Sequence, residues 1–406
     1  MSEITANSVP ATASSYYDSA RGNVARLTIA QALGGANSAV VYSTGAVVGN
    51  ILAPNAALAT LPISMFVVGM AASTLPAGAI ARGYGRRAAF LIGTGCGVLG
   101  GLLAAIAVVI GSFWLYCVAT LFSGSYASVV VSFRFAAAEC VSPERRPRAL
   151  SFVMAGGVFA GVIGPQLVNN TMYLWMPHMF AASYLAQAAL AAISALLLVS
   201  VRLPKPTAAE AAHGRPLSIV ARQPRFITAV ICGVVSYLLM NFLMTAAPLA
   251  MQLCGLSQKS SNLAIQWHVI AMYAPSFFTG RLINRLGAPS VVLSGLVLTG
   301  LSAAVGLMGV DVAHFWIALI LLGVGWNFGF VGASALVLEC HRPEERESVQ
   351  SLNDFAVFGT MTFGSFLSGG LLTAYGWNTV LGLSSVPLVM AVIALATTAH
   401  ARFAHA

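Results

Sequence analysis

The sequence predicts an all-α integral membrane protein whose twelve transmembrane helices form two six-helix bundles related by an internal repeat. Three observations lead to this fold class. The residues are 58% hydrophobic and only 8% charged, whereas about 25% are charged in a typical soluble domain. Twelve stretches have the length that a membrane helix needs, about 20 mostly apolar residues. A polar motif recurs in the second half of the chain, 200 residues after its first copy.

Six apolar stretches in the first half are predicted to cross the membrane, and six more in the second half. Those of the first half are 27–51, 57–81, 88–111, 113–138, 149–168 and 180–201. Those of the second half are 226–251, 262–283, 290–310, 313–338, 349–374 and 378–400. Pro275 is expected to bend the eighth span.

These spans divide the chain into five regions. They are an N-terminal tail (1–26), an N-terminal bundle (27–201), a linker (202–225), a C-terminal bundle (226–400) and a C-terminal tail (401–406). The linker holds four prolines and the densest cluster of basic residues in the chain. The N-terminal tail has no apolar core of the length found in signal peptides, so no cleaved leader is expected.

Lysine and arginine residues predict how the chain is oriented. Eighteen of the 20 lie in the two tails, the linker and the loops that follow even-numbered spans. Because basic residues concentrate in short cytoplasmic loops, both termini are predicted to be cytoplasmic, in a multi-pass protein of the cell membrane, the inner membrane in a bacterium. Lys259 is predicted to face the opposite side. The net charge of +9 is then a topology signal, and nucleic-acid binding is not expected.

The repeat is visible in two pairs of loops. Residues 139–150 read ECVSPERRPRAL and residues 339–350 read ECHRPEERESVQ, with five identities in the first eight positions. Each copy is predicted to end the fourth helix of its half. GAIARGYGRR begins at Gly78 and GRLINRLGAP at Gly280, each between the second and third spans of its half. Parallel repeats of six spans are typical of one large class of secondary transporters.

With these motifs the sequence resembles the major facilitator superfamily over essentially its whole length. The superfamily's cytoplasmic loop motif is glycine, three residues, Asp, Arg, any residue, glycine and two basic residues. The matching positions are Gly78, Gly85, Arg86 and Arg87 in the first copy and Gly280, Arg285 and Gly287 in the second. Arg82 and Asn284 replace the acid. The resemblance implies two bundles that rock around a central cavity lined by spans 1, 4, 7 and 10 with their neighbours 2, 5, 8 and 11.

Charged side chains within spans are costly and therefore mark candidate functional sites. Asp354 lies about two turns into the eleventh span, where coupling or gating and a structural ion pair are both open interpretations. Arg134 lies in the fourth span, where its long stem could reach the surface or its charge could favour an anionic substrate. The resemblance implies that the acid of the loop motif lies against the cytoplasmic start of the eleventh helix, where N–H groups favour negative charge. Because Arg82 takes the place of that acid and should repel the helix start, we predict that Asp354 pairs with Arg82, with Arg134 as the alternative partner. This pair would hold the cytoplasmic gate shut.

Two acids at the ends of the fourth spans are predicted to form salt bridges with the basic loops. Glu139 is expected to pair with Arg86, and Glu339 with Arg285. Such pairs would fix the loops of the motif, and breaking them would bias which side of the protein is open.

His268 is the only histidine well inside a span, and it is a candidate for proton coupling or a packing histidine. Further polar or aromatic residues are candidates for the cavity, although each could also be a hydrogen bond between helices. These candidates are Gln31, Asn37, Tyr42, Tyr126, Arg134, Asn241, Gln266, Trp267, Tyr273, Trp326 and Asn327. As a set they indicate a moderately polar organic ligand, with aromatic side chains that could stack on a flat ring.

The predicted function is a secondary active or facilitative transporter that moves a small organic solute by alternating access. Protons are a candidate coupling ion, and the protein is expected to work as a monomer in the lipid bilayer. The alternative is a non-transporting membrane sensor or assembly partner on the same fold. The six cysteines include no close CxxC pair, and no catalytic motif occurs, so neither a metal, nor a cofactor, nor an enzymatic activity is expected.

Overall fold

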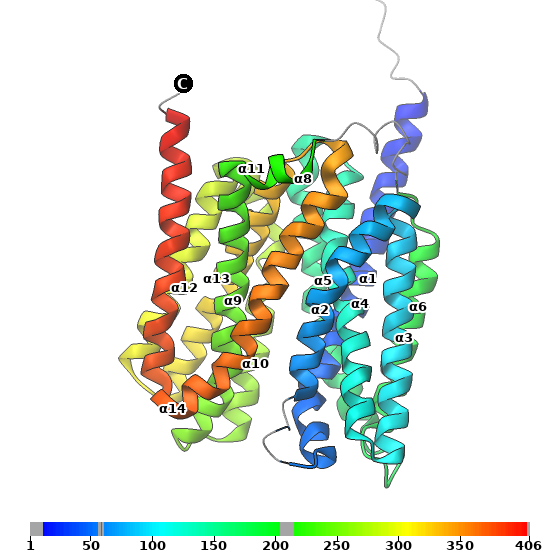
Figure 1. Cartoon of the computed structure of the whole chain (residues 1–406), viewed down its shortest axis with the longest axis vertical. Coiled ribbons are helices and arrows are strands. Elements are labelled where there is room, and N and C mark those ends of the chain that lie inside the picture. Colours follow the sequence, from blue (N-terminus) through cyan, green and yellow to red (C-terminus); the bar gives the residue numbers. More distant parts are fainter. Residues whose placement is uncertain (1–10, 56–57, 59–60, 204–214, 404–406) are drawn as a thin grey trace, which may run out of the picture.

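The computed structural model describes residues 11–55, 58, 61–203 and 215–403, and all regular structure there is helical. The first half contains α1 (Ala11–Leu52), α2 (Leu61–Tyr84), α3 (Arg86–Ile110), α4 (Phe113–Glu139), α5 (Arg146–Thr171) and α6 (Ala181–Val199). The second half contains α9 (Pro224–Leu253), α10 (Gln258–Tyr273), α11 (Ser276–Leu286), α12 (Ala288–Met308), α13 (Val312–Leu338) and α14 (Arg346–Phe403). Short elements are η2 (Pro143–Arg145), α8 (Leu217–Ala221) and η3 (Pro343–Glu345). Figure 1 shows the helices packed side by side with their axes along the long dimension of the molecule, as in a membrane bundle.

The twelve predicted spans map onto these helices with two differences in how they are divided. The eighth span consists of α10 and α11, separated at Pro275, which has no N–H group to continue the helical ladder. The eleventh and twelfth spans both lie in α14, which breaks at Gly376, where φ is 78°. Within the described residues, nine segments are long and apolar enough to span a membrane. The helix is thus interrupted at Pro275, where a bend was expected.

The N-terminal boundary differs from the prediction. Helix α1 begins at Ala11, inside the segment predicted to be a polar tail, and residues 1–10 lie outside the described part of the chain. The polar segment becomes structured because Asn23 exchanges two hydrogen bonds with the backbone of Arg202: its Nδ2 donates to the carbonyl at 2.6 Å and its Oδ1 accepts the N–H at 3.1 Å. The end of α6 is thereby attached to the start of α1. Of the predicted linker, residues 204–214 also lie outside the described part.

The repeated loop motif has the same backbone geometry in both halves. Gly85 precedes α3 with φ 86° and ψ 157°, and Gly287 precedes α12 with φ 83° and ψ 150°. This region is essentially restricted to glycine, because a Cβ atom would clash with the backbone. The sequence match between the two loops therefore reflects one sharp turn that is used twice.

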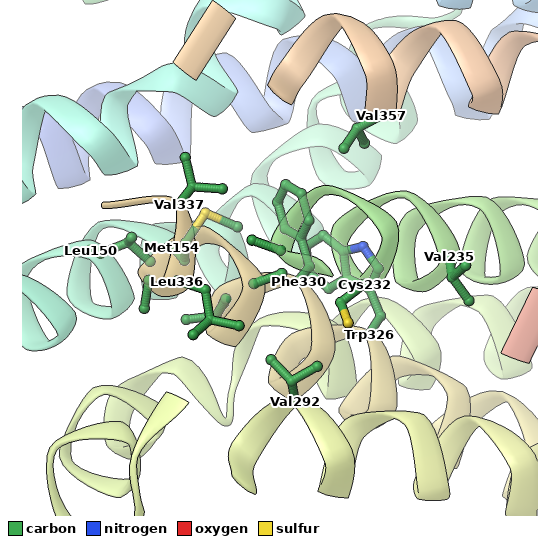
Figure 2. Packing of buried hydrophobic residues seen from close by; sticks show 14 of the residues in the cluster. Leu150, Met154, Cys232, Val235, Val292, Trp326, Phe330, Leu336, Val337 and Val357 are labelled. Atoms are coloured by element: carbon green, nitrogen blue, oxygen red, sulfur yellow. The ribbon is translucent and has the colours of Figure 1, made fainter. Parts of the chain in front are cut away.

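A large buried cluster joins the two halves. It includes Val41, Phe66 and Met154 from the first half and Trp326, Phe330 and Val357 from the second. Figure 2 shows part of this cluster, with Trp326 and Phe330 on α13 next to Cys232 and Val235 of α9 and Val357 of α14.

Candidate functional site

The two halves contact each other at the end of the bundle that carries the repeated loops, which we call the motif end. In Figure 1 the first part of α14 approaches α2 at this upper end, and the two helices diverge toward the lower end. Gly78 of α2 allows the approach, because a Cβ atom added there would lie 1.9 Å from the Ser351 hydroxyl oxygen on α14. The structure is therefore closed at the motif end.

The repeat provides an equivalent contact on the opposite side of the bundle. Gly280 of α11 donates its backbone N–H to the Ser151 hydroxyl on α5 at 3.0 Å. A Cβ atom added at Gly280 would lie 2.5 Å from the carbonyl oxygen of Pro147. Ser151 and Ser351 are 200 residues apart, the interval of the repeat. Neither serine was predicted from the sequence, although the 200-residue interval of the repeat relates the two positions.

Charged side chains link the halves just inside the motif end. Arg86 forms two hydrogen bonds with Glu139, at 3.0 and 2.7 Å, which confirms this predicted pair. Arg86 also donates to Gln350 and lies 3.0 Å from the Glu347 carboxylate, both on α14. The guanidinium of Arg86 is buried. It therefore joins α3 and α4 of one half to α14 of the other.

The predicted salt bridge between Arg82 and Asp354 is wrong. Arg82 is exposed in the last turn of α2 and donates to the Ser348 hydroxyl at 3.2 Å. Asp354 is buried two turns deeper along α14 and accepts from Arg134 Nη2 at 2.6 Å, so the alternative partner is the one that the structure has. Depth along the helix decides between the two arginines.

Arg134 is fully buried in the junction between the halves, so its side chain does not reach the surface. Its Nε donates to the Ser334 hydroxyl at 3.1 Å, and its Nη1 donates to the backbone carbonyl of Val131. The guanidinium carbon lies 4.2 Å from the ring centroid of Phe135 and 4.7 Å from that of Phe330. Every face of this charge is therefore held by protein. We call Arg134 and Asp354 the interface ion pair.

A polar pocket borders the interface ion pair between α2, α3, α4 and α14. Its cavity volume is about 40 Å³, and it is partly open to solvent. Its polar lining includes Thr74, Arg86, Ser128, Ser132, Gln350 and Asp354. The Ser128 hydroxyl is buried there without a hydrogen-bond partner.

The second copy of the acidic loop makes different salt bridges from those predicted. Glu339 lies 4.0 Å from Arg225, the beginning of α9, and its predicted partner Arg285 is exposed at the end of α11. Glu345 was not selected by sequence reasoning. Its carboxylate accepts from Arg215 Nε at 2.6 Å and Nη2 at 2.7 Å and from two backbone N–H groups at 3.0 Å. The Arg215 hydrogen bonds lower the pKa of Glu345 to about 2, and they attach the end of the linker to the second half.

Five aromatic rings form one cluster next to the interface ion pair. They are Tyr237 of α9, Tyr273 of α10, Trp326 and Phe330 of α13 and Phe358 of α14, with neighbouring centroids 4.9–5.6 Å apart. Trp326 is stacked on Phe330, and the other four pairs meet edge to face. Of these rings, sequence reasoning selected Tyr273 and Trp326 only. We call this group the aromatic cluster.

Two hydrogen-bond donors close to the aromatic cluster have no partner. Trp326 Nε1 is buried and unpaired, and so is Asn241 Nδ2. Asn241 lies four residues after Tyr237, so both side chains are on the same face of α9. A ligand or a water molecule that reaches the aromatic cluster would find these two donors free.

Two of the predicted cavity residues form their hydrogen bonds within their own bundle, Asn37 in the first half and Asn327 in the second. Asn37 exchanges hydrogen bonds with Gln187 of α6, at 2.9 and 3.2 Å. Asn327 donates to the Met272 carbonyl at 2.6 Å and to the Ser276 hydroxyl at 2.5 Å, across the break between α10 and α11. Both amides therefore connect helices within a half.

Three other candidates lie in the first half. Tyr42 of α1 is half-buried, and its ring meets Phe66 of α2 at 5.3 Å. Gln31 and Tyr126 are buried, and the Gln31 carbonyl oxygen and the Tyr126 hydroxyl have no hydrogen-bond partner.

The candidates close to His268 in the sequence do not lie together in the structure. His268 is buried between α10 and α13, with Nδ1 2.7 Å from the Leu319 carbonyl oxygen and Nε2 without a partner. Gln266 and Trp267 are exposed, because successive residues of a helix point in directions about 100° apart. Tyr273, about one and a half turns after His268, does reach the aromatic cluster. Among the residues that the structure describes, no group of three or more His, Cys, Asp or Glu could hold a metal ion.

Two repeated bundles that are closed at one end by buried charges, around a junction with unpaired donors, define a secondary transporter that works by alternating access. The chain belongs to the Major Facilitator Superfamily, whose family model matches residues 27–266 and 229–402. It is accordingly a multi-pass membrane protein that moves a small-molecule substrate.

Individual relatives cover nearly the whole chain. The riboflavin transporter RfnT of Brucella anthropi is 47% identical over 381 residues, which are 91% of this chain and 96% of that protein. The uncharacterized MFS-type transporter YdeG of Bacillus subtilis is 30% identical over 393 residues, 90% of each chain. Among solved structures, the human organic anion transporter MFSD10 has a TM-score of 0.76 at 16% identity and covers 93% of this chain and 99% of that one. The proton:xylose symporter XylE has a TM-score of 0.75 at 13% identity, with 94% and 95% covered. At these identities the two structures support the fold alone.

Proposed function

We propose that this chain transports riboflavin, as a monomer in a bacterial inner membrane. The proposal is supported by the 47% identity to a riboflavin transporter over 91% of the chain. The observation that carries it is the aromatic cluster with its unpaired donors, because the isoalloxazine ring of riboflavin is flat, aromatic and edged with hydrogen-bond acceptors. The site thus fits the chemical class of the solute that the relative's name gives.

The exposed parts of the aromatic cluster suggest how a flat ring is held. Tyr237 and Tyr273 are half-buried, whereas Trp326 behind them is buried. Aromatic pairs add about 0.5–1.5 kcal/mol beyond the area that they bury. The Trp326 indole N–H and the Asn241 amide would donate to carbonyl oxygens and ring nitrogens along the edge of the flavin. We infer that these four residues contact the substrate.

We further propose that the motif end faces the cytoplasm and that protons drive transport through Asp354. The orientation is supported by the eighteen basic residues on that side of the predicted topology. Asp354 is 4% exposed at the junction of the halves, where an ionisable side chain is costly and is associated with proton relays. Arg134 faces it from α4, Asn353 from its own helix, and Arg86 and Glu347 line the adjoining pocket. A proton on Asp354 would cancel one charge of the pair and favour opening toward the cytoplasm.

Counterflow in proteoliposomes tests the substrate without assuming a direction. Vesicles loaded with unlabelled riboflavin are expected to accumulate external labelled riboflavin when they contain the chain, and empty vesicles are not. Trp326→Leu should reduce this exchange at least about tenfold, because a stacking face and a donor are lost. Trp316→Leu is the matched control on the same helix, since Trp316 donates to Ser260 and lies outside the aromatic cluster. Absence of counterflow by folded parent protein would refute riboflavin transport.

A pH gradient tests the coupling. In vesicles that contain the parent chain, an interior more acidic than the medium and an interior more alkaline than the medium should change the steady-state level of riboflavin in opposite directions. Asp354→Asn should abolish this response, whereas His268→Gln should retain it, because His268 is buried between α10 and α13 and does not contact the interface ion pair. An unchanged response in folded Asp354→Asn would remove Asp354 from the coupling mechanism.

A further inference from the structure

The aromatic cluster and the interface ion pair touch each other through one side chain, Phe330 of α13. Its ring stacks on Trp326 with centroids 5.3 Å apart and an angle of 18° between the planes. It also meets Tyr237 with centroids 4.9 Å apart at 81°. The guanidinium carbon of Arg134 lies 4.7 Å from the centroid of the same ring. Phe330 is 1% exposed, so no solvent separates these contacts.

We propose that Phe330 is a positioning residue that transmits occupancy of the aromatic cluster to the interface ion pair. This inference rests on the proposed function, the transport of a flat flavin ring. Trp326 and Phe330 are closely packed and buried, so a ring that stacks against Tyr237 and Trp326 must displace their neighbours. Phe330, stacked on Trp326, moves with it. The empty and the occupied cluster therefore present different surfaces to Arg134.

The displacement matters because the attraction between a cation and a ring depends on the cation lying over the ring face. When Phe330 moves, Arg134 loses one of the groups that hold it against Asp354. Arg134, Val131 and Phe135 belong to the first half, whereas Asp354, Ser334 and Phe330 belong to the second. Weakening the contact between Arg134 and Phe330 therefore weakens a link between the halves. Substrate binding would thus favour opening of the motif end.

Phe135 of α4 provides a matched comparison. Its ring is buried and lies 4.2 Å from the Arg134 guanidinium carbon, a contact of the same kind as that of Phe330. Among the ring pairs of the described residues, none joins Phe135 to Trp326 or Tyr237. Removing either ring takes one face from Arg134, but only Phe330 connects that face to the substrate.

The experiment measures how riboflavin changes the accessibility of the motif end. A Ser348→Cys reporter on α14, opposite Arg82, is placed in a chain whose Cys96 and Cys254 are replaced by alanine. Maleimide labelling is followed in purified protein with and without saturating riboflavin, so that changes in affinity do not enter. In the parent, riboflavin is expected to accelerate labelling. Phe330→Leu should reduce this acceleration about tenfold, the change that loss of one desolvated cation–π contact produces in an equilibrium.

The controls separate coupling from folding and from the proposed substrate. Phe135→Leu should retain the riboflavin-dependent acceleration, and Phe330→Tyr, which keeps the aromatic face, should restore it. Phe330→Met, of similar volume, replaces Phe330→Leu if the latter does not fold. Equal acceleration in the Phe330→Leu and Phe135→Leu chains would overturn the role of Phe330 while leaving riboflavin transport intact. If the folded parent neither binds nor exchanges riboflavin, the proposed function fails and this inference fails with it.

Discussion

Removal of one member of the interface ion pair should destabilise the protein more than removal of both. Arg134 is 0% exposed and the side chain of Asp354 is 6% exposed, so neither charge is hydrated when its partner is lost. Breaking a buried pair costs about 3–5 kcal/mol, whereas replacing both charges with neutral groups of similar size is often nearly neutral. Asp354→Asn and Arg134→Met should therefore each reduce stability, and the double variant should recover much of the loss.

The structure also predicts which single substitution is worse. In Asp354→Asn, Arg134 keeps the Ser334 hydroxyl, the Val131 carbonyl and two aromatic faces, but its charge cannot be removed. In Arg134→Met, the Asn353 amide at 2.9 Å is the one hydrogen bond that Asp354 keeps among the described residues, yet a carboxylate can become neutral by binding a proton. We therefore expect the loss in Asp354→Asn to be about 3 kcal/mol and that in Arg134→Met to be smaller at acidic pH.

The native cysteines supply the assay. Cys117, Cys140, Cys232 and Cys340 are buried, so their reaction with a fluorogenic maleimide reports unfolding on heating. The four proteins of the double-mutant cycle are compared in one detergent at pH 5.5 and 7.5. Arg82→Ala is the control, because this exposed arginine bonds only Ser348 among the described residues and should change stability by less than about 1 kcal/mol. A double variant whose loss equals the sum of the two single losses would refute the coupling of Arg134 with Asp354.

Two further predictions concern the motif end, and a third concerns the opposite side of the membrane. Gly78→Ala should destabilise the closed motif end by about 1–3 kcal/mol, because the added methyl group overpacks the contact with α14, and it should slow transport. Gly83→Ala is the control on the same helix, because a Cβ atom there meets nothing within 4 Å. Equal transport rates in the two variants would contradict the close approach of α2 and α14. Glu345→Gln should lower the unfolding temperature at all pH values from 5 to 8. The pKa of Glu345 is lowered from 4.5 to about 2, so its salt bridge with Arg215 is fully formed above pH 4.5 and is lost only as the pH falls through 2. A lower unfolding temperature that appears only below pH 5 would contradict this. Lys259→Cys should react with an impermeant thiol reagent added outside spheroplasts, and labelling from the cytoplasm alone would invert the proposed topology.

Much of the fold could be predicted from the sequence, because the length of the apolar stretches and the 200-residue repeat can both be read directly from it. The turn at Gly85 and Gly287 follows from the matched loops, and the division of the eighth span follows from Pro275. The start of α1 at Ala11 was missed because residues 11–26 are polar, and their structure depends on Asn23 meeting the end of α6. Contacts between distant segments of this kind leave no periodic signal.

The candidate site was predictable in part. Asp354 and Arg134 could be selected because charge inside an apolar span is rare, but their pairing could not be chosen over the pair with Arg82. Spacing along α2 and α14 does not fix how deeply one helix lies against the other. Phe330 and Tyr237 were not selected, because an aromatic residue in an apolar helix is unremarkable until its neighbours are known.

The internal repeat explains why the closed end is asymmetric. Ser151 and Ser351 occupy equivalent positions, and each lies against a glycine of the opposite half. The next positions differ: Glu347, Gln350 and Asp354 of α14 correspond, 200 residues earlier, to Pro147, Leu150 and Met154 of α5. The buried acids of this contact therefore lie on the side of α2 and α14, and α5 meets α11 through shape and serine hydrogen bonds. Under the proposed coupling, binding of a proton at Asp354 would change the charge on one side only. Substitutions on the α5 side would then test how well the helices fit together, and those on the α14 side would test the role of charge.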